Sequence, residues 1–236
     1  MIAAVINGVL VLVGSIVGLL VKGKLSEKFS RAVMVAVALC VAMIGISSAM
    51  KDENTLCVII CMVVGVILGE WIKIEQRIDA LGEKLKSKVT KGGAASAHFT
   101  EGFMTATLLF CIGSMAIVGS IEAGINKDYT IILSKSIIDC ISAVTLAAAL
   151  GIGVAFSSIG VLVYQGAITL IAIYVGPFLS QAMINEMSAV GGLLIIGLAI
   201  NMLGLAKDKL RVGNMLPAVF LPVVYIPVEN LIKSLF

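Results

Sequence analysis

A lysine and an aspartate stand four residues apart in a segment that is otherwise almost entirely apolar. Lys135 and Asp139 belong to the stretch "LSKSIIDCIS", residues 133–142. A helix brings positions four apart onto one face, where opposite charges can pair. In water such a pair is ordinary, whereas inside a membrane each charge costs about 2.5–3.5 kcal/mol. The chemistry of the pair therefore depends on what surrounds this segment.

The composition of the chain places the pair in a membrane. Of the 236 residues, 60% are hydrophobic and 13% are charged, and the mean hydropathy is +1.12. A soluble globular domain is about 45–50% apolar and about 25% charged. Apolar runs of about 20 residues, enough to cross the hydrocarbon core, follow one another almost without interruption. The sequence predicts an all-α, polytopic membrane helix bundle that forms a single membrane domain over residues 1–236.

We expect about eight transmembrane helices, because the apolar runs are continuous and do not alternate as in an outer-membrane barrel. The first run lacks the basic region and cleavage site of a secretory signal, so it is interpreted as a retained span. The fourth, around "CIGSMAIVGSIEAGINKD", is rich in Gly and Ser and is either continuous or broken. GxxxG pairs at Gly14/Gly18 and Gly65/Gly69 predict close helix contacts. The expected spans are residues 2–21, 32–50, 55–72, 102–121, 129–150, 154–175, 186–206 and 213–233.

The loops that follow the first, third and seventh spans are strongly basic. They carry thirteen of the 17 Lys and Arg residues, and eight spans place all three loops on one side. The positive-inside rule puts that side in the cytoplasm. We therefore expect a multi-pass protein of the bacterial plasma (inner) membrane with both termini outside. Basic loops beside a lipid bilayer are no indication of nucleic acid binding.

Two of the expected spans resemble each other. The segments "GVLVLVGSIVGLLV" from Gly8 and "GVLVYQGAITLIAI" from Gly160 align without gaps and share six residues. These two spans run in opposite directions, so a true repeat has inverted topology, as in many secondary transporters. Alternatively, both helices simply use glycine for packing. The repeat interpretation divides the domain into a first repeat at 1–72, an amphipathic helix and connector at 73–98, central spans at 99–152 and a second repeat at 154–233.

Two interpretations of the charge pair remain open. In the functional interpretation, Asp139 binds or carries a cation or proton near the midplane, and Lys135 sets its charge state. In the structural interpretation, Lys135 reaches the outer interface, and Asp139 is satisfied by Lys135 and by hydroxyls such as Ser136 or Ser142.

Five further polar residues in the expected spans are candidates for substrate or ion binding. Glu122 and Ser114 lie in the fourth span, where small residues let a helix unwind and expose backbone groups to an ion. Placement of Glu122 in headgroup water is the simpler alternative. Asn7 and Gln165 lie in the two spans that resemble each other, and Asn201 lies in the seventh. Each amide alternatively makes only an interhelical hydrogen bond.

An amphipathic segment follows the third span. Apolar residues recur at three- and four-residue spacing from Trp71 to Val89, with charged residues on the remaining faces. This pattern predicts a cytoplasmic helix that lies on the inner membrane surface or packs on the bundle. The "KGGAASAH" that comes next is interpreted as a flexible connector.

Residues typical of enzyme active sites are largely missing from the sequence. His98 is the single histidine and lies in the connector, so no histidine metal site or nucleophile–histidine pair can form. The five cysteines fall in expected spans and form no CxxC motif or disulfide framework. A P-loop is also missing. We expect no enzyme, no catalytic residue, no metal and no cofactor.

Several stretches resemble one bacterial membrane family: "FCIGSMAIVGSIEAGINKDYTIILSKSIIDC", "GIGVAFS", "YQGAITL" and "NMLGLAKDKLRVGNMLPAV". The chain is similar over nearly its whole length to the integral membrane family of YqgA/YdfK-like proteins, domain of unknown function 554. That family's pattern has Pro at Ser114, an acidic residue just beyond Glu122 and Gly at Cys140. Lys135 and Asp139 match its Lys-Ser and Asp positions. The resemblance implies a multi-pass inner-membrane protein and supplies no substrate.

Two classes of function follow from these features. The first is a secondary transporter or ion-conducting protein for a small solute or ion, coupled through the carboxylate of Asp139. The second is a non-transporting scaffold or partner subunit whose buried charge pair is structural. The expected partners are the lipid bilayer, the transported solute or ion and, through the GxxxG pairs, further copies of the same chain.

Overall fold

A computed structural model of the chain describes residues 1–22, 27–77, 80, 83–84, 99–112 and 114–235, and these residues form helices and no strand. The main helices are α1 (Ile2–Lys22), α2 (Glu27–Ala49), α3 (Thr55–Ile72), α5 (Phe99–Cys111), α6 (Ser114–Ile125), α7 (Thr130–Leu150), α8 (Gly153–Val175), α9 (Gln181–Leu203), the 3₁₀ helix η3 (Val212–Phe220) and α10 (Pro222–Leu235).

Within the described part of the chain, five helices are long and apolar enough to cross a membrane, and two bent pairs raise the number to seven. The apolar part of α2, Met34–Ala49, is shorter than those spans. Two expected helix starts were wrong: α2 begins at Glu27 and α9 at Gln181, five residues earlier than predicted in each case. At α9 the reason is a polar cap, because the Ser180 hydroxyl accepts the Met183 N–H at 3.2 Å.

Two pairs of successive helices are sharply bent at a short break. α5 and α6 meet at 59°, and η3 and α10 meet at 43°. The second bend is explained by proline, since Pro217 and Pro222 cannot donate a backbone hydrogen bond. The first bend falls in the Gly- and Ser-rich segment, for which the sequence left a continuous and a broken helix open, and the structure has two separate helices there. Membrane proteins tolerate such breaks where the chain is buried or lines a cavity.

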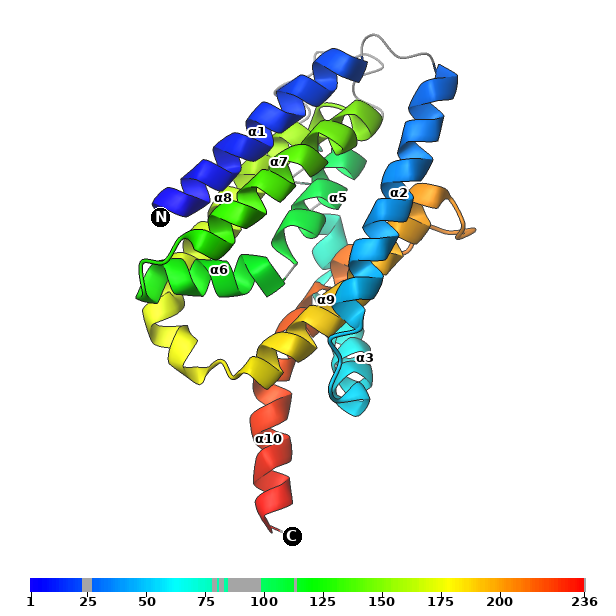
Figure 1. The fold of residues 1–236 in the computed structure, drawn as a ribbon. Coiled ribbons are helices and arrows are strands. Elements are labelled where there is room, and N and C mark those ends of the chain that lie inside the picture. Colours follow the sequence, from blue (N-terminus) through cyan, green and yellow to red (C-terminus); the bar gives the residue numbers. More distant parts are fainter. Residues whose placement is uncertain (23–26, 78–79, 81–82, 85–98, 113, 236) are drawn as a thin grey trace.

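The helices form two bundles that alternate along the chain (Figure 1). In the first bundle α1 packs against α7 and α8, and α5 and α6 also pack on α8. In the second bundle α2 packs along α9, while η3 packs against α3 and α9. Contacts between the bundles are sparser and run chiefly between α2 and α7. The seam between the bundles, defined by α2 on one side and α5, α6 and α7 on the other, is therefore the loosest part of the packing.

Glycines bring the helices of each bundle to backbone contact. A Cβ atom on Gly18 of α1 would lie 2.2 Å from the Val144 carbonyl oxygen of α7. One on Gly69 of α3 would lie 1.8 Å from the Asn214 carbonyl oxygen of η3. Both GxxxG pairs thus make close contacts inside the chain, as small residues do between membrane helices.

Replacing Gly69 with alanine should therefore destabilise the second bundle. Because the added methyl meets backbone and not a flexible side chain, we expect a loss of about 1–3 kcal/mol. Gly166→Ala is the matched control, since its Cβ would be 3.7 Å from the nearest atom, on Met1. Thermal unfolding of both purified variants in detergent checks this, and equal midpoints would contradict the packing described.

Candidate functional site

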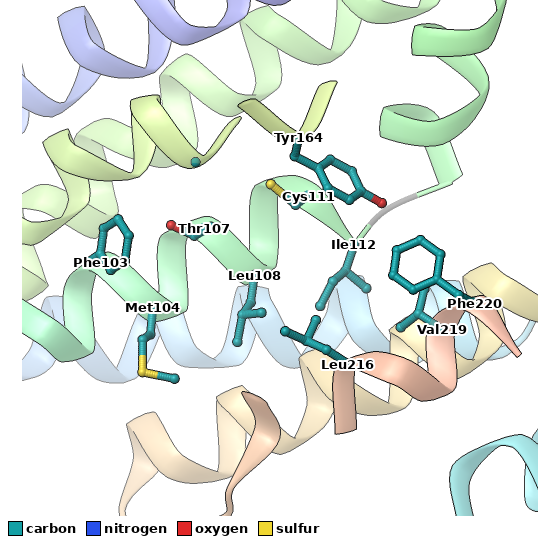
Figure 2. Close-up of a pocket in the computed structure, with 11 residues that line it drawn as sticks. Phe103, Met104, Thr107, Leu108, Cys111, Ile112, Tyr164, Leu216, Val219 and Phe220 are labelled. Atoms are coloured by element: carbon teal, nitrogen blue, oxygen red, sulfur yellow. The ribbon is translucent and has the colours of Figure 1, made fainter. Parts of the chain in front are cut away.

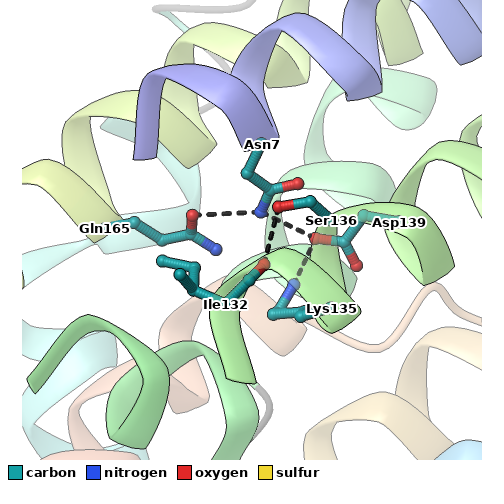
Figure 3. A network of polar contacts seen from close by, with 6 residues as sticks. All are labelled: Asn7, Ile132, Lys135, Ser136, Asp139 and Gln165. Atoms are coloured by element: carbon teal, nitrogen blue, oxygen red, sulfur yellow. Dashed lines mark hydrogen bonds and ion pairs between the residues drawn. The ribbon is translucent and has the colours of Figure 1, made fainter. Parts of the chain in front are cut away.

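The predicted charge pair is buried at the centre of the first bundle (Figure 3). Lys135 and Asp139 are each 5% exposed, and the Lys135 ammonium donates to Oδ2 of Asp139. From α1, Asn7 Nδ2 donates to the same Asp139 oxygen at 3.0 Å. Asn7 Nδ2 also donates to Gln165 Oε1 on α8 at 3.0 Å. The ion pair and two amides thus connect α1, α7 and α8.

This arrangement corrects part of the structural interpretation. The Lys135 side chain is buried and turned toward Asp139. Ser136 is not a partner of Asp139, since its hydroxyl donates to the Ile132 carbonyl of its own helix at 2.6 Å. The residue of another helix that binds Asp139 is Asn7. The sequence marked Asn7 as a candidate only because it is a polar amide within an expected span. Removing one partner of a buried ion pair typically costs about 3–5 kcal/mol.

Part of the hydrogen-bonding capacity of the ion pair is left over. Within the described residues, Oδ1 of Asp139 and two of the three Lys135 N–H groups have no hydrogen-bond partner. Both side chains line a cavity of about 160 Å³ at the seam. The Lys135 ammonium also lies 6.0 Å from the Phe110 ring centroid, within reach of a cation–π interaction. The pair can therefore bind a further polar group from the cavity.

The cavity beside the ion pair is mostly polar at one end. It lies between α2 and α7, next to the bend between α5 and α6. Ser48 and Lys51 of the α2 end line it opposite Ser142 of α7. Its other lining residues are Ile44, Leu109, Phe110, Met115 and Ile138.

Two more cavities continue along the same seam. One of about 470 Å³ shares the lining residue Lys51 with the central cavity, and its lining also includes Asp52, Glu53, Gln181 and Asn185. The other, of about 210 Å³, shares Ser142 with the central cavity and extends along α2 and α7 to Leu146. The row of cavities thus runs from the polar turn after α2, past the ion pair, to an apolar end.

An apolar cavity lies on the opposite face of α5 (Figure 2). Its volume is about 360 Å³, and it is enclosed by α5, α8 and η3. Thr107 and Tyr164 contribute its hydroxyl groups, and the rest of the lining is apolar except for Cys111. The bent fourth span therefore has open space on both sides.

Sequence reasoning missed a second buried acid, Glu186. It is 1% exposed, and its Oε1 accepts the N–H groups of Glu53 and Asn54, both at 2.9 Å. Asn54 in turn caps α3 by accepting the Cys57 N–H and donates to Glu229 of α10. Glu186 therefore ties α9 to the start of α3. In the sequence this residue lies at the edge of an apolar run. At that position a carboxylate exposed to water fits the pattern as well as a buried one.

The remaining predicted residues lie away from the ion pair. Glu122 accepts the Asn126 side-chain amide at 2.6 Å, at the far end of α6. Asn201 exchanges two hydrogen bonds of 2.8 Å with the Leu210 backbone, where it fixes the turn after α9. Ser114 begins α6, and its side chain is outside the described part of the structure. The structure thus joins four of the seven candidates: Asn7, Lys135, Asp139 and Gln165.

The other features of the chain lie outside the spans. Most of the amphipathic segment after the third span, with His98, lies outside the described residues. Asp128, in the turn before α7, is exposed, and hydrogen bonds from the Thr130 hydroxyl and N–H lower the pKa of its carboxyl. Among the residues described, no group of three or more His, Cys, Asp or Glu is placed to hold a metal ion.

The role of Glu186 can be tested with two substitutions. Glu186→Leu leaves the Glu53 N–H without an acceptor and removes one of the two acceptors of the Asn54 N–H, and a buried N–H without an acceptor costs about 1–3 kcal/mol. Glu186→Gln keeps a carbonyl acceptor, so we expect it to lose less than half as much. Thermal unfolding in detergent measures both, and an equal loss in the two variants would rule out this capping role.

Comparison with known proteins agrees with the membrane character of the chain. A family model described as "Protein of unknown function (DUF554)" matches residues 2–227. The chain is 32% identical over 230 residues to "Uncharacterized membrane protein YdfK" of Bacillus subtilis (strain 168), which covers 96% of each chain. It is 28% identical over 218 residues to "Uncharacterized protein YqgA" of Escherichia coli (strain K12), which covers 92% of each. No solved structure matches. With its helical membrane spans and a family match over almost its full length, this chain belongs to the DUF554 family.

Proposed function

We propose that this protein is a secondary transporter or ion-conducting protein of the bacterial inner membrane, and not an enzyme. It moves a small solute or ion along the seam between its bundles and couples that movement through Asp139. The observation that supports this best is the row of cavities that reaches a buried ion pair with unused hydrogen-bonding groups. An ionisable pair inside a membrane is by default a candidate site for ions or protons.

The bent helices support the same function. Secondary transporters commonly build their sites near the midplane from interrupted helices. Here the bend between α5 and α6 borders the central cavity, where Met115 contributes to the lining. The apolar cavity on the other face of α5 gives this half-span room to move. Such a movement would change access to Asp139 without breaking either bundle.

In this proposal the bundle has eight spans, with α2 as a full span and both termini outside. The contacts at its two ends fit that arrangement. The turn after α2 is tied to the start of α9 through Glu186. At the opposite end, Arg211 of the loop after α9 pairs with Glu70 near the end of α3 at 3.3 Å. The inverted repeat remains part of the proposal, and the two helices it relates, α1 and α8, pack antiparallel through Asn7 and Gln165.

A scaffold is the alternative function, and one observation favours it. The hydrogen bonds of Asn7 join three helices through the ion pair, as a purely structural brace would. The two functions differ in what happens when the charge of Asp139 is removed. In a scaffold the change strands a buried lysine and lowers stability. In a transporter the cavity still hydrates Lys135, and coupling is lost while the fold survives.

Charge movement across the membrane separates these functions. Wild-type protein in liposomes on a solid-supported membrane should give a current when the pH is stepped in the presence of small ions. Asp139→Asn should abolish the pH-driven current with nearly normal folded yield, because the amide cannot exchange a proton. Asp128→Asn is the control. It makes the same chemical change at an exposed residue in the turn before α7, so it should leave the current unchanged.

The opposite pattern supports the scaffold. If wild type is silent across the ions tested and Asp139→Asn unfolds at a much lower temperature, the pair is a brace. An equal loss of current in both variants would mean that the current reports surface charge and not the buried site.

The proposed orientation is tested with two matched aspartates. Asp128 and Asp208 are both exposed, and they lie in turns at opposite ends of the spans. In a background without the native cysteines, Asp128→Cys should react with an impermeant maleimide in intact cells. Asp208→Cys should react only after permeabilisation, because it belongs to a basic, cytoplasmic loop. The reverse pattern would invert the proposed orientation.

A further inference from the structure

We infer that the site at Lys135 and Asp139 binds a small ammonium ion and releases one proton from Lys135 in exchange. This inference rests on the proposed function and names its substrate class. It starts from the group that the site already holds. The Lys135 ammonium is paired with the Asp139 carboxylate, and it lies 6.0 Å from the centroid of the Phe110 ring. A carboxylate and an aromatic ring both attract ammonium groups, so an incoming ammonium ion meets the same partners.

The central cavity provides room for such an ion beside Lys135. The three residues of the site, Lys135, Asp139 and Phe110, all line this cavity. Its volume of about 160 Å³ corresponds to roughly five water molecules at about 30 Å³ each. Ammonium or methylammonium fits such a space together with a few water molecules, whereas a long polyamine does not. The size of the cavity therefore limits the ligand to a small ammonium ion.

Acceptors for the N–H groups of the ion also line the cavity. Oδ1 of Asp139 has no hydrogen-bond partner within the described residues, although the side chain is only 5% exposed. Ser48 and Ser142 line the cavity from opposite sides, and their hydroxyl groups can accept hydrogen bonds. One carboxylate oxygen and two hydroxyls match the three N–H groups of a primary ammonium ion. In the described part of the chain, no group of three or more His, Cys, Asp or Glu is placed to hold a metal ion.

The charges along the row of cavities also favour a cation. Within the described residues, two lysines and three acids line the row: Lys51, Lys135, Asp52, Glu53 and Asp139. The acids outnumber the lysines even when both lysines are counted in full, and pairing between Lys51 and any of these acids leaves that sum unchanged. Behind the turn after α2, Glu186 adds a further carboxylate, whose Oε1 accepts the Glu53 N–H. Cavities with an excess of carboxylates raise the local concentration of cations.

Lys135 competes with the incoming ion for Asp139. Two ammonium groups beside one buried carboxylate leave a positive charge without a counter-ion, and such a charge is costly inside a membrane. The cost disappears when Lys135 releases one proton from Nζ to the water of the cavity and becomes a neutral amine, as a buried lysine can. One ammonium ion enters and one proton leaves. No bond to carbon changes, and the net charge of the site is zero before and after the exchange.

Within the described part of the chain, few other titratable groups face the pair. Lys51 faces it across the cavity from the end of α2, and the Cys111 thiol interacts with both members from the end of α5. From α1 and α8, the hydrogen-bonded network of the pair contains the uncharged Asn7 and Gln165. Proton release is assigned to Lys135, because this is the group that shares the Asp139 carboxylate with the incoming ion.

The exchange also defines what the pH-driven current measures. A complete cycle exchanges one positive charge for another, so it moves no net charge. A pH step without an added ammonium ion moves protons to or from Lys135 alone, and this displacement of charge within the membrane gives a brief current. Without Asp139, Lys135 has no counter-ion with which to keep its proton, so Asp139→Asn should give no such current.

The test is titration calorimetry of methylammonium chloride into the purified full chain in detergent, compared with sodium chloride at equal ionic strength. Wild type should bind methylammonium more tightly than sodium and should release one proton for each ion bound. Titrations at about pH 7 in two buffers with different heats of ionisation measure the number of protons released. Because one proton leaves, binding should become about tenfold tighter for each pH unit between about pH 6 and about pH 8.

Two variants of Lys135 separate ion binding from proton release. Lys135→Arg keeps a positive charge beside Asp139, but arginine does not release its proton, so this variant should fold and lose methylammonium binding. Lys135→Met should bind methylammonium without proton release and without pH dependence, because the added ion is then the counter-ion of Asp139. Methylammonium should also raise the unfolding temperature of Lys135→Met. Asp128→Asn, at an exposed carboxylate, is the control and should bind as wild type does.

Three results would overturn the inference: no binding of methylammonium beyond that of sodium by folded wild type, binding without proton release by wild type, or equal binding by wild type and Lys135→Arg. Each result leaves the proposed transport function standing if the pH-driven current persists. Conversely, methylammonium binding with proton release by a protein that gives no pH-driven current in liposomes would confirm the site and remove the transport proposal.

Discussion

Inside hydrocarbon there is no water to solvate the Lys135 ammonium or the Asp139 carboxylate. The helices of the first bundle therefore have to supply the polar contacts that water would otherwise make. The two charges pair with each other, and Asn7 reaches in from α1 to donate a second hydrogen bond to the same carboxylate oxygen. Asn7 can do so only because α1 lies in backbone contact with α7, and that contact requires Gly14 and Gly18. The close packing of α1 on α7 and the hydrogen bond of Asn7 therefore depend on the same glycines. A bulkier residue at either glycine would push α1 away and would also withdraw the Asn7 amide from the ion pair.

In the second bundle, buried backbone N–H groups at the end of the helices need hydrogen-bond acceptors. The start of α3 has several backbone N–H groups without partners in the helix. The side chain of Asn54 accepts one of them, from Cys57, and a buried glutamate from α9 accepts the N–H groups of Glu53 and Asn54 just before the helix. Each bundle thus has its own network of polar contacts. In the first bundle the network lies in the middle of the helices, and in the second it lies at their end. Neither network crosses the seam between the bundles.

Much of this architecture is visible in the sequence, because apolar runs mark spans and a helical spacing of four marks a charge pair. The pairing of Lys135 with Asp139 was expected from that spacing, whereas the burial of Lys135 was left open, because a lysine can also extend to the interface. The link to Asn7 and Gln165 does not follow from that spacing, since it depends on how three separated helices pack. Helix starts were misplaced where polar caps extend a helix beyond its apolar run, as at Ser180. Glu186 was missed because it lies near the end of a span. At such a position the sequence does not distinguish a carboxylate among lipid headgroups from one that is buried beside the start of another helix.

The order of the bundles along the chain has a consequence for how the protein is made. The first bundle contains α1 together with α5 to α8, while α2 and α3 belong with α9, η3 and α10. A nascent chain emerges from the ribosome N-terminal end first. α1 must therefore wait in the membrane through the synthesis of three further spans before α7 arrives. α2 must wait longer still for α9, and α3 for η3. No early segment of the chain is a finished unit, so assembly depends on keeping incomplete helices apart until their distant partners have been inserted.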